Sequence, residues 1–284
     1  MRDLIPSKTM KRSERSILLL LCFGCWNQNA HAQTEPDRDT TFLDFVGTGN
    51  VQRSLDNGEG LPASTGLGVM LDEYHIDKSI FWGTVYRVRF SGQINVANTE
   101  DTLAIEYKPD GALKEPSAIG EAIMTPLVGR RAADLDLMLF FDSATVGSFL
   151  SGMHVKYTGS NRLLSDTATT VKATMNAIRL RLFHDIVGRK YNKDFNVLIG
   201  AGWAYNSIRG DVGLAANESF RGRLLGTKRK AFNGLEIFAQ FRIKNIKAEF
   251  SYTWLDPGGN IPGISGGRMI TTVSFVGGFP VKLN

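Results

Sequence analysis

Apolar and polar side chains alternate along residues 237–254, IFAQFRIKNIKAEFSYTW. Every second residue from Ile237 to Ile243 is apolar, and after the pair Lys244-Asn245 the alternation resumes and continues to Trp254. A period of two places successive side chains on opposite faces of a β-strand. The segment therefore predicts two adjacent strands joined by a tight turn, with one face of the pair free of charge.

A two-residue turn at Lys244-Asn245 also predicts which residues lie opposite one another. The order Lys-Asn is not the favoured Asn-Gly, so the turn type and the register stay open at this point. The apolar pairs that the turn predicts are Phe241 with Ala248, Ala239 with Phe250, Ile237 with Tyr252, and Leu235 with Trp254.

The same alternation recurs through most of the chain after its first 32 residues, whereas a sustained helical period is hard to find. In 171–184 the apolar positions change phase after Ala177, which predicts a β-bulge. We expect about twelve strands, with about ten as the fallback because the segments 102–108 and 117–127 are interrupted. The expected strands are 41–51, 63–74, 80–97, 102–108, 117–127, 133–142, 146–158, 169–184, 194–206, 230–243, 246–255 and 267–281.

Long polar connections alternate with short turns between these strands. With the N-terminus in the periplasm, the odd-numbered connections, which include 51–63, 207–230 and 256–267, lie outside the cell. Barrels that cross the outer membrane have short periplasmic turns and long external loops. The segment KPDGALKEP, 108–116, is an even-numbered connection and is longer than this pattern predicts.

The uncharged face of the strands packs either on a protein core or on lipid. The uncharged stretch 235–243 has nine residues, close to the ~9–11 that a tilted strand needs to cross hydrocarbon. No segment has the ~18 consecutive apolar residues of a membrane helix, so this chain would cross a membrane with closed strands. The rival is a soluble β-sandwich or barrel with the apolar face inward. We predict the all-β membrane alternative, a closed antiparallel transmembrane β-barrel.

Aromatic residues near the strand ends match the girdles that membrane barrels carry at both interfaces. The residues expected to face lipid or to form a girdle are Trp82, Trp203, Tyr205, Phe250, Tyr252, Trp254, Phe275 and Phe279.

Charged residues fall on the opposite faces of the strands and are expected to face the lumen. Separated charges across a water-filled bore would steer ions or small polar solutes, whereas a close ion-pair network would plug and brace the wall. Large water-filled pores usually need about 16 strands, so both alternatives stay open. The expected lumen residues are Arg87, Arg89, Asp134, Asp136, Lys156, Lys172, Glu236, Arg242, Lys247 and Glu249.

The first 32 residues have the pattern of a cleaved secretory signal peptide. A basic lead precedes the apolar run SILLLLCFGCW, and AHA at 30–32 offers small residues to a signal peptidase. Translation from Met10 instead of Met1 would give an even more usual signal peptide. We expect residues 33–284 to form one barrel domain. Both cysteines, Cys22 and Cys25, leave with the signal, so disulfides do not stabilise the exported chain.

Charge and composition exclude several partners. Residues 1–32 hold five Lys or Arg and two acids, so of the chain's 33 basic and 28 acidic residues 28 and 26 remain, a net charge of +2. This is not the polybasic field that nucleic-acid binding needs. The remaining histidines, His75, His154 and His184, are scattered, so we expect no metal site and no cofactor.

Hydrolytic chemistry has little support in the pattern. Some barrel hydrolases pair a serine with a histidine, but Ser151 falls on the strand face opposite to His154. His184 lies near a predicted periplasmic turn, away from external lipid. We predict that the protein is not an enzyme; a lipid hydrolase is the lesser alternative, and it would lose activity in a His154→Ala variant.

The signal peptide, the all-β chain and the ending RMITTVSFVGGFPVKLN together resemble the single-domain, porin-like outer-membrane β-barrel proteins of Gram-negative bacteria. The resemblance implies a location in the outer membrane, with lipid and the barrel-assembly machinery as partners. Many members end on an aromatic residue that this machinery reads, whereas here Phe279 is followed by PVKLN.

Two functions follow as hypotheses. The first is passive or gated passage of a small solute through or along the barrel. The second is a structural or interaction protein with a closed lumen, whose long loops at 207–230 and 256–267 contact an external protein partner.

Overall fold

The computed structural model divides the chain into two compact units, 1–36 and 37–284, and everything that follows concerns the second. The structure describes residues 40–54, 64–80, 83–96, 102–110, 113–114, 116–124, 131–141, 150–165, 170–187, 195–256, 258–261 and 263–282. The predicted signal peptide, 1–32, lies outside these residues and stays a prediction.

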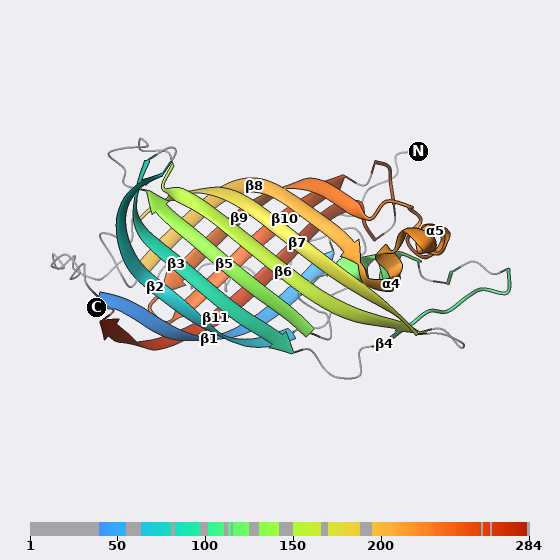
Figure 1. Cartoon of the computed structure of the whole chain (residues 1–284), viewed down its shortest axis with the longest axis horizontal. Coiled ribbons are helices and arrows are strands. Elements are labelled where there is room, and N and C mark those ends of the chain that lie inside the picture. The colour runs from blue at the N-terminus through green and yellow to red at the C-terminus, as the bar shows by residue number, and fades with distance from the viewer. Residues whose placement is uncertain are drawn as a thin grey trace, which may run out of the picture. The chain divides into compact units, whose positions relative to one another are not determined.

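Ten antiparallel strands pair side by side around an axis (Figure 1). Their order is β6-β5-β3-β2-β1-β11-β10-β9-β8-β7, and β7 pairs with β6 again, so the pairings return to their starting strand. The strands are β1 (Thr40–Ser54), β2 (Ser64–Ile80), β3 (Gly83–Val96), β5 (Arg131–Phe141), β6 (Gly152–Ser165), β7 (Thr170–Asp185), β8 (Phe195–Arg209), β9 (Ala231–Ile243), β10 (Ile246–Asp256) and β11 (Gly266–Lys282).

The connections at one end of the ring carry further secondary structure. The other end has the two-residue turns of β2–β3 and β9–β10, but also connections of ten and nine residues at β5–β6 and β7–β8. We call the end that carries the β1–β2, β3–β5, β6–β7, β8–β9 and β10–β11 connections the long-connection end, and the other the short-turn end. The long-connection end holds the short strand β4 (Thr102–Ala104), the helix α2 (Pro116–Met124), the helical turns α4 (Gly210–Gly213) and η2 (Ala215–Asn217), and the helix α5 (Glu218–Leu225). β4 runs parallel to β6 over three residue pairs.

The β9–β10 hairpin has the register that the sequence predicts. Its turn is Lys244-Asn245, and Lys244 has a positive φ of 51°. Ala239 lies opposite Phe250, and the other three predicted apolar pairs are also opposite one another. From Leu235 to Trp254 the outward side chains of the two strands are apolar, whereas the inward positions hold charged residues such as Glu236 and Glu249 together with the buried Phe238.

The expectation of about twelve strands is wrong at 117–127. Its described residues, 117–124, belong to α2 instead, and of 102–108 only Thr102–Ala104 pairs as a strand. Ile119, Ala122 and Ile123 are buried, and their spacing of three and four residues places them on one face of a helix. Since β3 and β5 are direct neighbours, KPDGALKEP belongs to a connection at the long-connection end and not to a short turn. Among the described residues the ring has ten strands, the smaller of the two numbers expected.

The bulge predicted in 171–184 is also absent from the described pairings of β7. β7 pairs without a register shift with both β6 and β8. The apolar residues change phase because the inner surface along β7 changes from apolar to charged after Ala177, while the outer surface becomes apolar. Met175 and Ala177 face inward and are buried, whereas Leu180 and Leu182 face outward and are exposed. Register shifts occur instead between β2 and β3, near His75.

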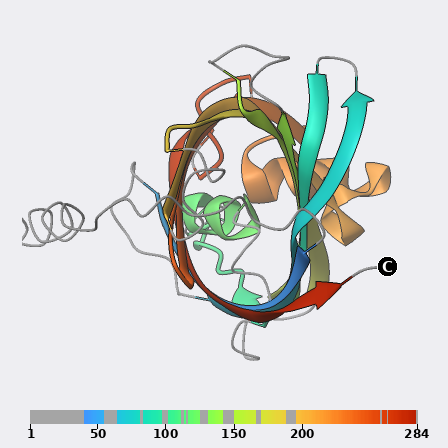
Figure 2. The same cartoon turned by 90° about the vertical axis from the view of Figure 1, so that its left-hand side faces the viewer.

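Two apolar clusters occupy the inside of the ring. At the long-connection end, Ile119 and Met124 of α2 and Leu224 of α5 pack on inward wall residues such as Met175 and Phe232. Figure 2, seen from the short-turn end, shows α2 in green inside the outline of the strands. Toward the short-turn end, the second cluster consists of Met138, Phe140, Phe183, Leu198 and Phe238.

Candidate functional site

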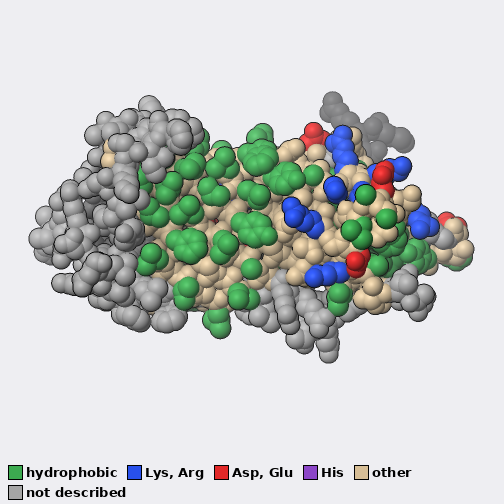
Figure 3. All heavy atoms as spheres, in the orientation of Figure 1, with side chains coloured by type: hydrophobic (Ala, Val, Ile, Leu, Met, Phe, Trp, Pro, Cys, Tyr) green, Lys and Arg blue, Asp and Glu red, His purple; other side chains and the backbone are tan. Residues whose placement is uncertain are grey.

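The outer surface of the strands is apolar. Leu235, Ile237, Phe250 and Phe275 are exposed by 68%, 50%, 40% and 63%. Figure 3 shows hydrophobic side chains spread over the middle of the strands, with Lys and Arg side chains gathered toward the end that carries α4 and α5. We call these outward apolar side chains the apolar belt. Soluble monomers rarely expose a contiguous apolar surface of more than a few hundred Å², so we infer that another apolar phase covers the belt.

The residues expected to face lipid lie on this outer surface wherever the structure describes them. Trp203, Phe250, Trp254 and Phe275 are exposed, and Tyr205 and Tyr252 are half-buried. Trp82 and the side chain of Phe279 lie outside the described residues.

Two aromatic pairs stand on the half of the belt nearer the long-connection end. Trp203 stacks on Tyr205 with ring centroids 5.6 Å apart, and Tyr252 meets Trp254 edge-on at 4.1 Å. Leu235 of β9 pairs with Trp203 of β8 and with Trp254 of β10, so the two aromatic pairs lie at the same level of the ring.

The inside of the ring carries a network of buried charges centred on Arg181 of β7. Arg181 Nε lies 2.8 Å from Glu236 Oε2, and Nη2 lies 2.9 Å from Glu236 Oε1. Its Nη1 donates to Glu249 Oε1 at 2.8 Å. Arg181, Glu236 and Glu249 are exposed by only 2%, 2% and 5%. Charges buried to this degree are stable only when they are paired, and each of these is.

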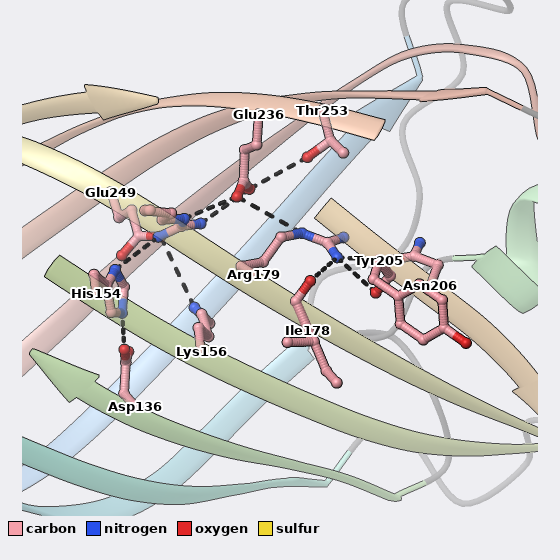
Figure 4. A network of polar contacts seen from close by, with 11 residues as sticks. Asp136, His154, Lys156, Ile178, Arg179, Tyr205, Asn206, Glu236, Glu249 and Thr253 are labelled. Atoms are coloured by element: carbon pink, nitrogen blue, oxygen red, sulfur yellow. Dashed lines mark hydrogen bonds and ion pairs between the residues drawn. The ribbon is translucent and has the colours of Figure 1, made fainter. Parts of the chain in front are cut away.

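His154 of β6 extends the network to β5. Arg181 Nη1 points at His154 Nδ1 from 3.2 Å, and His154 Nε2 contacts Asp136 Oδ1 (Figure 4). Because a guanidinium can only donate, Nδ1 must be the acceptor and Nε2 must carry the proton. The two partners therefore fix His154 as the neutral Nε2–H tautomer.

Arg179 extends the network toward the long-connection end. Its Nη1 donates to Asn206 Oδ1 at 2.6 Å and to the Tyr205 carbonyl at 3.3 Å, and its Nε lies 3.7 Å from Glu236 Oε2. Thr253 Oγ1 also donates to Glu236 Oε1 at 3.2 Å. Polar contacts thus span β5 to β10 on one side of the bore (Figure 4).

Sequence reasoning missed Arg179 and Arg181, although the pattern held a signal for both. Ile178, Leu180 and Leu182 face outward, and residues between outward positions of a strand must face inward. The predicted bulge leaves open which side chains of 178–184 point inward, so it does not assign Arg179 and Arg181 to the lumen.

Most of the other expected lumen charges also lie inside. Arg87 stacks over the Phe140 ring at 3.8 Å, Arg89 Nη1 lies 3.5 Å from Met138 Sδ, and Asp134 accepts from Gln93 at 2.7 Å. Lys156 Nζ lies 3.9 Å from Glu249 Oε1.

One expected lumen residue, Lys172, is placed differently, and another, Arg242, lies at the rim of the inner face. Lys172 is exposed on the outward face of β7, because Ala173 and Met175 are the inward positions there. Arg242 holds the inward phase of Glu236 and Gln240 on β9, but it is half-buried beside the short turn, where its Nε donates to the Lys244 carbonyl at 3.2 Å.

A small polar cavity remains beside the network. Its volume is about 30 Å³, room for about two water molecules. Asp134, Asp136, Lys156, Lys247 and Glu249 line it, together with hydroxyl groups of β3 and β11. A space of this size admits water or a single small ion, but not a sugar or an amino acid.

The two histidines whose side chains the structure describes, His154 and His184, contact different kinds of partner. His154 contacts Arg181 and Asp136 and not a serine. Ser151 instead lies near His184, with Oγ 3.4 Å from Nδ1, while the Asp185 amide donates to the same Oγ at 2.9 Å. This Ser–His distance is longer than the ~2.6–3.2 Å of an activated nucleophile, a contact that is often looser without a bound ligand.

The described part of the chain contains neither a cluster of metal ligands nor a helix that could span a membrane. Its His, Cys, Asp and Glu residues form no group of three or more that could hold a metal ion. In the same residues, no helix has the length and hydropathy to cross a bilayer.

No protein-family model matches the chain, and no curated protein has a significant match. Solved structures do match. The NanC porin is 12% identical, with 83% of this chain and 98% of that chain covered and a TM-score of 0.32. The beta domain of the Bordetella autotransporter BrkA is 10% identical, with 84% and 99% covered and a TM-score of 0.33.

A third match is Ail, the attachment invasion locus protein of Yersinia pestis, in complex with a heparin analogue. It is 10% identical, with 85% of this chain and 98% of that chain covered and a TM-score of 0.30.

Proposed function

We propose that the protein is an outer-membrane β-barrel with a closed lumen, which acts as a structural or interaction protein through its long-connection end. The observation that carries the proposal is the position of Arg181. Its guanidinium reaches from β7 to acids on β9 and β10. Along β7, Arg181 lies between the two apolar clusters, with Met175 in one and Phe183 in the other.

The distribution of polarity supports insertion in a membrane. In a soluble barrel the apolar side chains would face inward and the charges outward. Here Phe250 and Leu235 face outward, whereas Arg181, Glu236 and Glu249 are buried inside. Lipid is the surrounding phase that favours this inverted arrangement.

The helices support the interaction role. Ile119 and Met124 of α2 and Leu224 of α5 form one cluster with the inner wall, so these connections are packed and not open. Packed helices present a surface of fixed shape at this end, and such preorganisation lowers the entropic cost of binding a partner.

Passage of a small solute is the second candidate, and the cavity beside the network is the observation that favours it. Five charged side chains line it, and charged linings select ions in channels. At about 30 Å³ it suits water or one small ion, so a larger solute would need the network to open.

Single-channel recording in planar bilayers tests the closed-lumen proposal. The protein is first shown to be folded by a change of gel mobility on boiling, and a porin in the same membrane is the positive control. We expect no steady openings from the folded protein. Reproducible, ion-selective openings would overturn the closed lumen and favour the second candidate.

A further inference from the structure

We propose that Lys172 of β7 and Arg209 of β8 together bind the phosphate of lipid head groups in the leaflet at the long-connection end. The inference rests on the proposed membrane insertion and adds to it a defined lipid contact.

The two side chains share the outer surface of the ring. Thr174 lies opposite Arg209 in the β7–β8 pairing, so Lys172 is the diagonal neighbour of Arg209 on the same face. Both residues are exposed. Diagonal neighbours on a sheet are about 7–8 Å apart, within reach of long side chains, so the two cations can converge on one phosphate group.

Their depth matches the head-group region. Arg209 lies four residues beyond Tyr205 on β8, which is about 13 Å along the strand and about 10 Å along the membrane normal for a strand tilted by ~40°. The head-group layer adds about 5–8 Å on each side of the hydrocarbon. Lys and Arg side chains can bend back toward it from just beyond the aromatic girdle.

The charges of both residues are available to a ligand. Within the described part of the chain, neither side chain makes a hydrogen bond or an ion pair. The neighbouring acid, Asp211, accepts a hydrogen bond from the main-chain amide of Lys172 at 2.8 Å. Arg223, Arg229 and Lys230 in the β8–β9 connection are also exposed and extend the positive charge beyond the pair.

The experiment measures how tightly the folded, detergent-solubilised protein binds diphosphorylated lipid A. The test variant carries Lys172→Gln and Arg209→Gln. The control is Lys244→Gln, which removes one exposed lysine at the short-turn end. Dephosphorylated lipid A and inorganic phosphate are the comparison ligands, and each protein is checked for its change of gel mobility on boiling.

We expect the double variant to bind lipid A about ten- to thirty-fold more weakly, since each cation near an anionic surface contributes about a factor of five. The control variant should bind lipid A like the original protein. Dephosphorylated lipid A should bind the original protein as weakly as it binds the double variant. A variant with Lys172→Arg and Arg209→Lys, which keeps both charges, should restore binding.

Equal affinity of the double variant and the original protein for lipid A would overturn the inference. Binding of inorganic phosphate as tight as that of lipid A would also overturn it, because the site would then read a free anion. Loss of the mobility change in the original protein would instead count against membrane insertion, so the two failures are distinguishable.

Discussion

Arg181 and Glu236 form two parallel hydrogen bonds, of 2.8 and 2.9 Å, that join β7 to β9 across the inner face of β8. A bidentate pair of this geometry fixes both side chains in one orientation. In the Glu236→Gln variant the Arg181 charge loses its strongest partner while it stays buried, so we expect the free energy of unfolding to fall by about 3–5 kcal/mol. Urea unfolding in lipid vesicles measures it.

Thr253→Val gives a graded control for the same acid. It removes only the 3.2 Å hydrogen bond to Glu236 Oε1 and keeps the side-chain shape, so we expect a loss of about 0.5–1.5 kcal/mol. If Glu236→Gln costs no more than Thr253→Val, the ion pair does not brace the barrel.

Phe250 lies midway along the outer face of β10, and its ring packs edge-on against Phe241 at 6.2 Å. For Phe250→Arg we expect a loss of about 2–4 kcal/mol, the cost of a charge near the middle of the bilayer. Asn233→Arg is the matched control, since Asn233 is exposed and pairs with Tyr205 at the aromatic level. Vesicle unfolding curves should separate the two variants.

Ser251→Arg is a poor control for the same question. Ser251 is exposed by only 5% and lies opposite Phe238, so an arginine there would overpack the interior. Equal costs for Phe250→Arg and Asn233→Arg would contradict a lipid-facing belt.

Gly152 lies where an inward side chain would collide with its neighbours. A Cβ at this position would overlap the Leu139 carbonyl and the Phe183 ring, whereas a Cβ at Gly277 meets nothing within 4 Å. We expect Gly152→Ala to lower the free energy of unfolding by about 1–3 kcal/mol. Gly277→Ala should leave it within about 0.5 kcal/mol in the same unfolding assay. The reverse order would show that the interior near Phe183 is loose.

Arg221 of α5 holds the β8–β9 connection together from inside. Its guanidinium donates to the carbonyls of Val212, Leu214 and Lys228 at 2.6–3.2 Å, and it is exposed by only 4%. Arg221→Met leaves these carbonyls unpaired, so we expect protease cleavage within 210–230 to become faster by at least about ten-fold.

Arg223→Met is the control, because Arg223 lies on the same helix but is exposed. The unfolding midpoint of the barrel should not change in either variant, since the strands pair without this connection. A fall of the midpoint together with faster cleavage would mean that α5 and the ring unfold as one unit.

The sequence predicts strands well where the position of the turn and the apolar alternation on either side of it lead to the same register. The register of the β9–β10 hairpin follows from Lys244-Asn245 and the apolar alternation on either side. The segment at α2 is harder, because a nine-residue piece with apolar residues at 119, 122 and 123 fits a short interrupted strand nearly as well. Only its packing against α5 and the inner wall decides for the helix.

The candidate site shows the same division. Alternation along one strand predicts that Glu236 and Glu249 face the same side as Arg242 and Lys247. It does not predict that Arg181 lies between the two acids, because that depends on the pairing of three strands. The outward position of Lys172 likewise depends on where the apolar inner cluster begins, a property of the tertiary packing.

The first and the last strand of the ring are partners, with Thr40 opposite Lys282. Until synthesis and export of the C-terminal segment are complete, β1 and β10 each present an unpaired edge, and such edges recruit other chains. Closure is therefore a late event that joins the two extremes of the sequence, and contacts so distant along the chain form slowly. A chain truncated before β11 should therefore accumulate as an aggregating intermediate with both of these edges open.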